Sequence, residues 1–182
     1  MSDVLARISR QLYLDRPAVR AWMLYDWANS AMYVVIVTAI FPTFFSAVAA
    51  QGLPPVEATY RFSLATTLGL TIIAVLSPIL GAIADHSAAK KRLLGAFLVF
   101  GATAVAAMFF IRHGQWEFAA LLFILANIGV NGSFVFYDSL LPHVAAPDEM
   151  DRISTAGYAL GYLGGGLFLV ACLGVILALI GA

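Results

Sequence analysis

Five long stretches of this chain carry almost no charged side chains, and each is long enough to cross a lipid bilayer. A membrane-spanning helix needs about 20 mostly apolar residues in succession. Inside hydrocarbon, a single segment satisfies its own backbone N–H and C=O groups only when it is helical. We therefore expect an all-α fold, a polytopic membrane bundle with transmembrane helices at about residues 22–50, 62–84, 93–111, 118–141 and 156–182.

The composition agrees with a membrane protein and excludes several other classes. Hydrophobic residues make up 62% of the chain and charged residues 11%, whereas a soluble domain carries about 25% charged residues. The formal net charge is zero, so no basic surface for nucleic acid is expected. The sole cysteine, Cys172, has no partner for a disulfide within the chain. Because the histidines His86, His113 and His143 are far apart in the sequence, we expect neither a metal site nor another cofactor.

The connections between the five stretches are short, which indicates antiparallel neighbours in one compact bundle. We therefore expect a single transmembrane domain over residues 1–182. A cleaved signal peptide is the alternative for the N-terminus, because the first stretch ends in a sequence that resembles a cleavage site, Ser46-Ala47-Val48-Ala49-Ala50. That stretch is long for a signal peptide and opens with Asp26 and Asn29, so we expect a retained first helix.

Basic residues fall mainly on one side of the predicted membrane. If the N-terminus is cytoplasmic, eight of the ten basic residues lie on that side and two on the other. The positive-inside rule then predicts a cytoplasmic N-terminus, and we expect a multi-pass protein of the cell (inner) membrane. The eight are Arg7, Arg10, Arg16, Arg20, Lys90, Lys91, Arg92 and Arg152, and the two are Arg61 and Arg112.

The fourth predicted helix carries a polar stripe. Asn127, Asn131, Phe134 and Asp138 are spaced by four, three and four residues, which places them on one helix face. Amide and charged side chains inside a membrane are costly, so they are the first candidates for a site. One interpretation is that the stripe lines a cavity filled with water or solute. The alternative is that the asparagines bond to neighbouring helices and hold the bundle together.

The first and fifth predicted helices add further candidates. Asp26 and Tyr33 share one face with Asn29 beside it, and Asp26 is expected at about the depth of Asp138. Two carboxyl groups at that depth could form a proton or cation relay, whereas a simple alternative is that Asp26 caps the first turn. In the fifth helix, the small-xxx-small spacing of Gly157, Gly161 and Gly165 predicts close helix packing, and Tyr158 is a secondary cavity candidate.

The connection after the second predicted helix is a candidate gate. Gly81 and Asp85 end that helix, and Lys90 and Lys91 follow. An acid beside a basic loop can form an ion pair that holds one conformation and opens in another. On spacing alone, a solvated loop that only sets topology is the simpler interpretation.

Several segments together resemble the major facilitator superfamily, and within it the group similar to the autophagy-related vacuolar amino-acid effluxer. The resemblance covers the chain from Ala21 onward. The segments are Tyr25-Asp26-Trp27-Ala28-Asn29-Ser30-Ala31, Phe41-Pro42-Thr43-Phe44-Phe45, Leu80-Gly81-Ala82-Ile83-Ala84-Asp85, Phe136-Tyr137-Asp138-Ser139-Leu140-Leu141-Pro142, Asp148-Glu149-Met150-Asp151-Arg152-Ile153-Ser154 and Gly157-Tyr158-Ala159-Leu160-Gly161-Tyr162.

The resemblance implies alternating access between two six-helix halves, a central cavity lined partly by the first and fourth helices, and efflux of amino acids or another small solute. It also matches Gly81 and Asp85 to the loop motif of the superfamily. His86 stands where that motif usually has a basic residue, and Ala88 replaces a glycine.

The chain holds five of the helices that the resemblance implies. We therefore expect it to be the N-terminal part of a carrier, in contact with the lipid bilayer and a small solute, and acting with the missing C-terminal half or another copy. The alternative is a non-transporting membrane subunit that associates with partner helices through its glycine-rich fifth helix. We expect no enzyme, because no catalytic arrangement of residues is visible.

Overall fold

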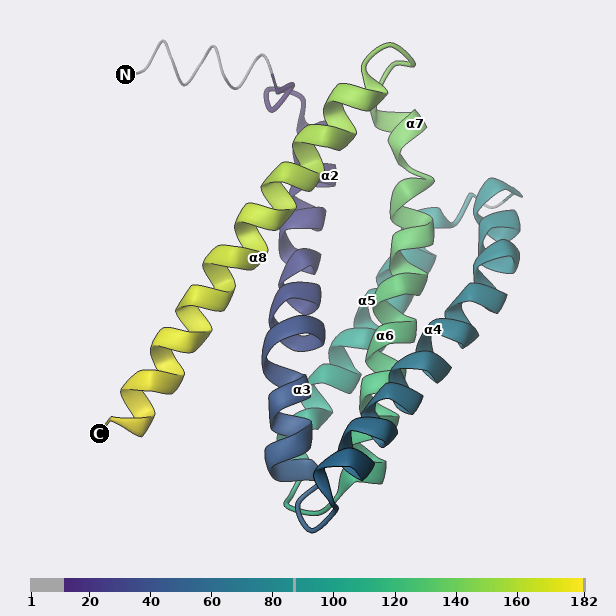
Figure 1. The fold of residues 1–182 in the computed structure, drawn as a ribbon. Helices are drawn as coiled ribbons and strands as arrows, with labels where there is room; N and C mark the ends of the chain where they lie inside the picture. The colour runs from purple at the N-terminus through teal and green to yellow at the C-terminus, as the bar shows by residue number, and fades with distance from the viewer. Residues whose placement is uncertain (1–11, 87, 182) are drawn as a thin grey trace. The chain divides into compact units, whose positions relative to one another are not determined.

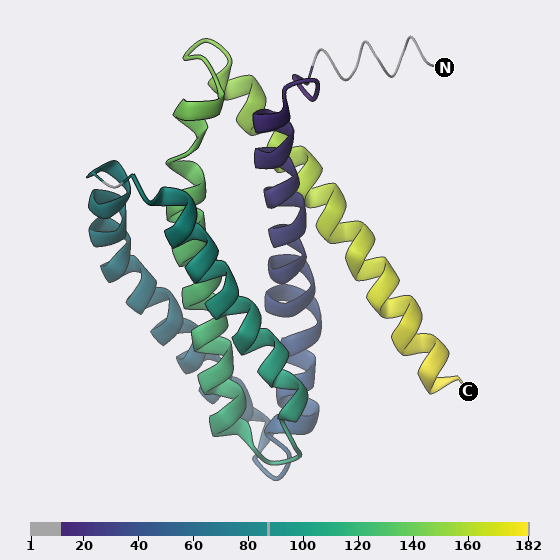
Figure 2. The same ribbon diagram turned by 180° about the vertical axis from the view of Figure 1, so that it is seen from behind.

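The computed structural model describes residues 12–86 and 88–181, and all regular elements within these ranges are helices (Figures 1 and 2). Five helical spans in the described part are long and apolar enough to cross a membrane. They are Pro17–Ala49, Pro55–His86, Lys90–Phe110, Trp116–Asp138 and Met150–Leu179. The predicted all-α, polytopic membrane fold is confirmed.

The spans begin earlier than the charge-free stretches of the sequence. The second span starts at Pro55 and includes Glu57 and Arg61, and the fifth starts at Met150. Long charged side chains near a helix end can extend to the membrane surface, so they do not terminate the helix. Proline also suits the first turn of a helix, because backbone N–H groups there have no carbonyl partner within the helix and proline lacks this group. α4 starts with Pro55. The predicted bounds were therefore too short at the N-terminal ends.

The chain divides into two compact units: Met1–Ala39 with Leu140–Ala182, and Ile40–Ser139. The first span contributes α2 (Pro17–Ala31) and most of the π-helical segment Met32–Ile40 to one unit. It contributes α3 (Phe41–Phe44) and the π-helical segment Phe45–Ala49 to the other. Pro42 cannot donate a hydrogen bond to the carbonyl one turn back, so a change of hydrogen-bond register near it is expected. One domain over residues 1–182 stays a prediction.

The first unit is built on α2 and α8 (Met150–Ile180), with the short α7 (Leu141–Val144) before α8. The two long helices lie side by side over the N-terminal half of α8, and its C-terminal half runs away from α2 (Figures 1 and 2). A β-carbon at Gly157 or at Gly164 would come within 2.6 Å of the Trp22 or the Trp27 ring, respectively. The glycines thus let two indole rings lie directly on the α8 backbone.

The second unit contains α4 (Pro55–His86), α5 (Lys90–Ala107), the short 3-10 segment Met108–Phe110 and α6 (Trp116–Asp138). Lipid tails are as apolar as leucine, so the hydrophobic effect does not drive these helices together within the membrane. They associate by close van der Waals packing. α6 packs against both α4 and α5. Gly101 and Gly129 bring α5 and α6 into backbone contact.

Aromatic and aliphatic side chains fill the rest of this unit. Phe41 stacks on Phe123 with ring centroids 4.9 Å apart, and Phe62 lies against both rings. Farther along the helices, Ile73, Leu80, Ala84 and Phe136 form a buried cluster. The core thereby fixes α6, and the polar residues on it, against α4.

Candidate functional site: polar residues within the spans

Asn127 lies in the contact between α6 and α4. Its side chain is buried, with 6% exposed, and a β-carbon at Gly69 would lie 3.7 Å from the Asn127 Cβ. The Nδ2 atom donates a hydrogen bond of 2.9 Å to the Phe123 carbonyl of the same helix. Because a buried amide without a partner costs about 1–3 kcal/mol, this bond offsets most of the burial cost.

Asn131 lies one turn farther along α6 and is half-buried. Its Nδ2 atom donates to the Asn127 carbonyl at 2.8 Å. Both amides thus bond to the backbone one turn back in their own helix. Such bonds hold the two amides against the backbone of their own helix.

Asp138 is the last residue of α6 and is exposed. The C-terminal end of a helix carries the negative end of its dipole, so a carboxylate there does not stabilise α6. Helix stability therefore does not account for this aspartate, and its place on the solute path stays a prediction.

Lys90 connects the beginning of α5 to the end of α6. Its Nζ atom donates to the Ser139 carbonyl at 3.3 Å, where a cation also suits the helix dipole. Gly81 is half-buried, whereas Asp85 and Lys91 are exposed. Asp85 has no ion pair among residues 12–86 and 88–181. The structure therefore brings Lys90 to α6 rather than to Asp85, a contact between residues 49 positions apart that spacing could not predict.

Asp26 and Asn29 lie in the contact between α2 and α8, with 2% and 5% of their surfaces exposed. A β-carbon at Gly161 would come within 2.6 Å of both Asp26 Oδ2 and Ser30 Oγ. The Nδ2 atom of Asn29 is buried and has no hydrogen-bond partner in the described part of the chain. A buried polar pair of this kind is costly in a membrane, which is typical of a functional position.

Tyr33 and Tyr158 complete the predicted set within this unit. Tyr33 is half-buried in the π-helical segment Met32–Ile40, and the Thr38 hydroxyl donates to its carbonyl at 2.9 Å. Tyr158 is 48% exposed on α8. The contact between α2 and α8 therefore encloses Asp26 and Asn29, while Tyr158 lies on the open side of α8.

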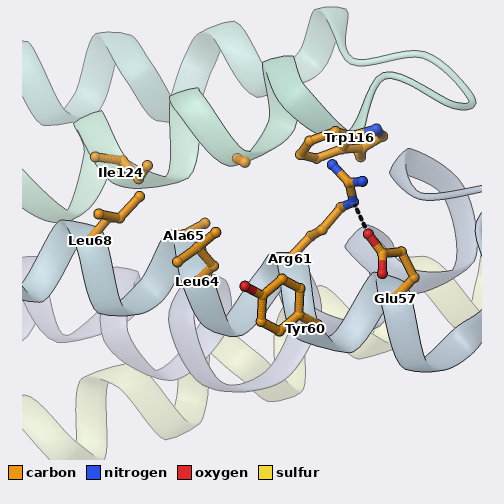
Figure 3. A pocket seen from close by; sticks show the side chains of 9 residues that line it. Glu57, Tyr60, Arg61, Leu64, Ala65, Leu68, Trp116 and Ile124 are labelled. Carbon is orange, nitrogen blue, oxygen red and sulfur yellow. Dashed lines mark hydrogen bonds and ion pairs between the residues drawn. The ribbon is translucent and has the colours of Figure 1, made fainter.

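One cluster was missed by the sequence analysis. Arg61 Nε donates to Glu57 Oε1 at 2.7 Å, and its Cζ atom lies 3.9 Å from the centre of the Trp116 ring (Figure 3). The signal was present in the spacing of Glu57 and Arg61, which suits an ion pair along one helix face. The charge-free stretch begins only at Phe62, so the pattern predicts Arg61 in the preceding connection.

A second ion pair lies outside the spans. Arg16, which precedes α2, and Glu149, which precedes α8, are 2.7 Å apart. The hydrogen bond from Arg16 holds the pKa of the Glu149 carboxyl below its ordinary value, and a 3.2 Å bond from the Ala146 N–H acts in the same direction. The Arg16 guanidinium also lies 4.5 Å from the Tyr13 ring centre. These contacts tie the starts of two long helices together.

Comparison with known proteins adds a family. Residues 56–151, which include α5, α6 and all of α4 except Pro55, match the family described as "Vacuole effluxer Atg22 like". The chain is 37% identical over 158 residues to an uncharacterized MFS-type transporter, YxiO, of Bacillus subtilis. It is 33% identical over 106 residues to autophagy-related protein 22 of Neurospora crassa, and 34% identical over 91 residues to that of Coccidioides immitis. No solved structure matches.

The matches cover different shares of the two chains. The Bacillus match covers 86% of this chain but 37% of the transporter, and the two fungal matches cover 56% and 50% of this chain but 14% of each relative. The chain thus spans well under half of the length of these relatives. The family match contains Asn127, Asn131 and Asp138, whereas Asp26 and Tyr158 lie outside it.

Proposed function

Because this chain belongs to the vacuole effluxer Atg22-like family, a group of the major facilitator superfamily, we propose that it is the N-terminal part of a carrier that moves a small solute across a membrane by alternating access. One observation carries the proposal. The family match covers three packed spans, α4 to α6, and one face of α6 holds two amide side chains in place. Positioned polar groups within a multi-pass membrane protein are the parts that a solute path requires.

We propose that Asn127, Asn131 and Asp138 line this path, together with Asp26, Asn29, Tyr33 and Tyr158. The amides can donate and accept hydrogen bonds, and the carboxyl groups can take up a proton or a cation. Gly81, Asp85, Lys90 and Lys91 would form the gating connection, in which Lys90 holds the end of α6. Gly157, Gly161 and Gly165 would allow close packing of α8.

An amino-acid-like solute is the proposed substrate class, and efflux is the proposed direction. Amide and carboxyl side chains can meet both the ammonium and the carboxylate of such a solute. The basic residues support a cytoplasmic N-terminus and the cell membrane, although Arg7 and Arg10, which contribute to that count, lie outside the described residues. A carrier of this family would act with its C-terminal half or with another copy, and its chemistry would be transport rather than catalysis.

A non-transporting subunit would use α8 to bind a partner helix. In the structure, positions along the glycine face of α8 are filled by α2, where Trp22, Asp26 and Ser30 lie against Gly157 and Gly161. A partner helix would therefore need another face. The apolar C-terminal half of α8 offers one, since Leu167, Val170 and Leu177 are each more than 60% exposed.

Solute flux in proteoliposomes tests the proposal. We expect liposomes that hold enough copies of the chain for them to associate to exchange labelled amino acids faster than empty liposomes, and Asn131→Leu or Asp138→Asn to abolish the difference. Asp148→Asn is the matched control, because Asp148 is an exposed acid outside the spans. If these variants instead alter only the association of the chain, measured by crosslinking, and no solute moves, the subunit alternative holds.

A further inference from the structure

A groove between α4 and α6 is polar at one end and apolar along the rest of its length (Figure 3). Glu57 and Arg61 form the polar end beside Trp116, and leucine and isoleucine side chains continue from it. The cavity has a volume of about 240 Å³. This is smaller than the roughly 300–1,000 Å³ of pockets that enclose a whole small-molecule ligand. The groove therefore suits part of a larger, elongated molecule. Its lining residues are Glu57, Tyr60, Arg61, Leu64, Ala65, Leu68, Trp116, Ala120 and Ile124.

The polar end of the groove lies at a membrane surface. α4 begins at Pro55 and α6 begins at Trp116, so both helices enter the membrane here. Tryptophan and tyrosine side chains prefer the level of the lipid headgroups, and Trp116 and Tyr60 line the groove near the starts of the two helices. From Arg61 to Leu68 the groove descends about 10 Å, at 1.5 Å per helical residue. It thus runs from the headgroup level into the hydrocarbon.

The charges at the polar end match a zwitterion better than an anion. Glu57 accepts a hydrogen bond from Arg61 Nε, and within the described ranges the two Nη atoms of Arg61 have no hydrogen bond or ion pair with the protein. A guanidinium held in this way presents paired donors to a phosphate. The Glu57 carboxylate beside it would repel a purely anionic headgroup but attract an ammonium group. The side chains of Glu57 and Arg61 remain 40% and 32% exposed, so a ligand can reach both.

We propose that this groove binds phosphatidylethanolamine from the surrounding bilayer. The lipid phosphate bonds to the Arg61 guanidinium, the lipid ammonium lies against Glu57, and the first part of an acyl chain lies along Leu64, Leu68 and Ile124. The stacking of Arg61 on Trp116 holds the guanidinium in place before the lipid arrives. This site is separate from the proposed solute path and does not depend on transport.

Native mass spectrometry of the purified chain with defined lipids tests the proposal. We expect dioleoyl-phosphatidylethanolamine to bind at least tenfold more tightly than dioleoyl-phosphatidylglycerol. Arg61→Gln should weaken binding of phosphatidylethanolamine about tenfold, the loss expected when a hydrogen bond to a charged group is removed. Glu57→Gln should reduce the preference between the two lipids. Arg112→Gln is the matched control, because Arg112 is an exposed arginine outside the groove, in the connection before α6, and it should bind like the wild type.

A second variant tests the apolar part of the groove independently. Leu68→Trp fills the groove and leaves Glu57 and Arg61 unchanged, so it should also weaken lipid binding at least tenfold, even if Arg61→Gln fails to fold. Equal binding of the two lipids by the wild type would overturn the proposal. So would an unchanged affinity in Leu68→Trp, equal effects of Arg61→Gln and Arg112→Gln, or equally tight binding of free phosphoethanolamine, which has no acyl chain.

Discussion

Gly161 of α8 lies so close to Asp26 of α2 that a β-carbon at position 161 would come within 2.6 Å of the Asp26 Oδ2 atom. The missing side chain leaves the room in which this buried carboxyl group fits. The contact between α2 and α8 therefore depends on a glycine opposite a polar group, and not only on apolar packing.

Gly161→Ala should destabilise this contact by about 1–3 kcal/mol, because the added methyl group overlaps with Asp26 and Ser30. Thermal unfolding in detergent measures the effect. Gly166→Ala is the control, because a β-carbon there meets nothing within 4 Å, and the higher helix propensity of alanine should leave stability unchanged or slightly higher. Equal losses for the two variants would show that α2 and α8 do not pack in this way.

Gly129→Ala should be more damaging than Gly161→Ala. The nearest atoms to a β-carbon at position 129 belong to the Gly101 backbone, which cannot move aside as a side chain can. We expect α5 and α6 to separate, which crosslinking between cysteines placed in the two helices would detect. Gly95→Ala in α5, where nothing lies within 4 Å, should preserve the crosslink. A preserved crosslink in Gly129→Ala would contradict the backbone contact.

Lys90→Met should loosen the end of α6 by about 1 kcal/mol, since it removes the hydrogen bond to the Ser139 carbonyl. Hydrogen exchange of the amides around Ser139 should become faster. Lys91→Met removes the neighbouring, exposed lysine and should leave this exchange rate unchanged. The same rate in both variants and in the wild type would mean that Lys90 is not bound there.

The Arg16–Glu149 pair should make stability depend on pH. The pKa of Glu149 is lowered in the folded chain, mainly by the hydrogen bond from Arg16. Its contribution is therefore fully present above the pKa of an unperturbed glutamate, about 4.3, and is lost as the pH falls through the lower pKa of the folded state. The stability difference between the wild type and Glu149→Gln, measured by thermal unfolding, should be constant near neutral pH and shrink below about pH 4.

The control for this titration is Asp148→Asn, which alters a neighbouring acid for which no partner is found in the described part of the chain. The difference between wild type and this variant should not follow the same curve. If the two differences vary with pH in parallel, general charge repulsion rather than the Arg16–Glu149 pair explains the dependence.

The fold was predictable because its main determinant is local. A run of about 20 apolar residues predicts a membrane-spanning helix, whatever the rest of the chain contains. The ends of the spans were less predictable, because residues such as Arg61 continue a helix at the membrane surface although they interrupt the apolar pattern.

The candidate site could be proposed from the sequence only as a pattern of residues along one helix. The spacing of Asn127 and Asn131 identified a stripe, but not that each amide bonds to its own backbone. Contacts between helices depend on which helices are neighbours and at what depth, and the sequence does not specify this. The pairing of Gly101 with Gly129, the bond from Lys90 to Ser139 and the stacking of Arg61 on Trp116 therefore became visible only in the structure.

The central claim is that the α6 stripe lines a water-filled solute path. Labelling of Asn131→Cys by a water-soluble thiol reagent tests it most directly, in a Cys172→Ala background that removes the native thiol. We expect labelling at least tenfold faster than at Leu121→Cys, a position on α6 that is 51% exposed and apolar. Equal, slow labelling at the two positions would contradict the claim, because it would place Asn131 out of contact with water.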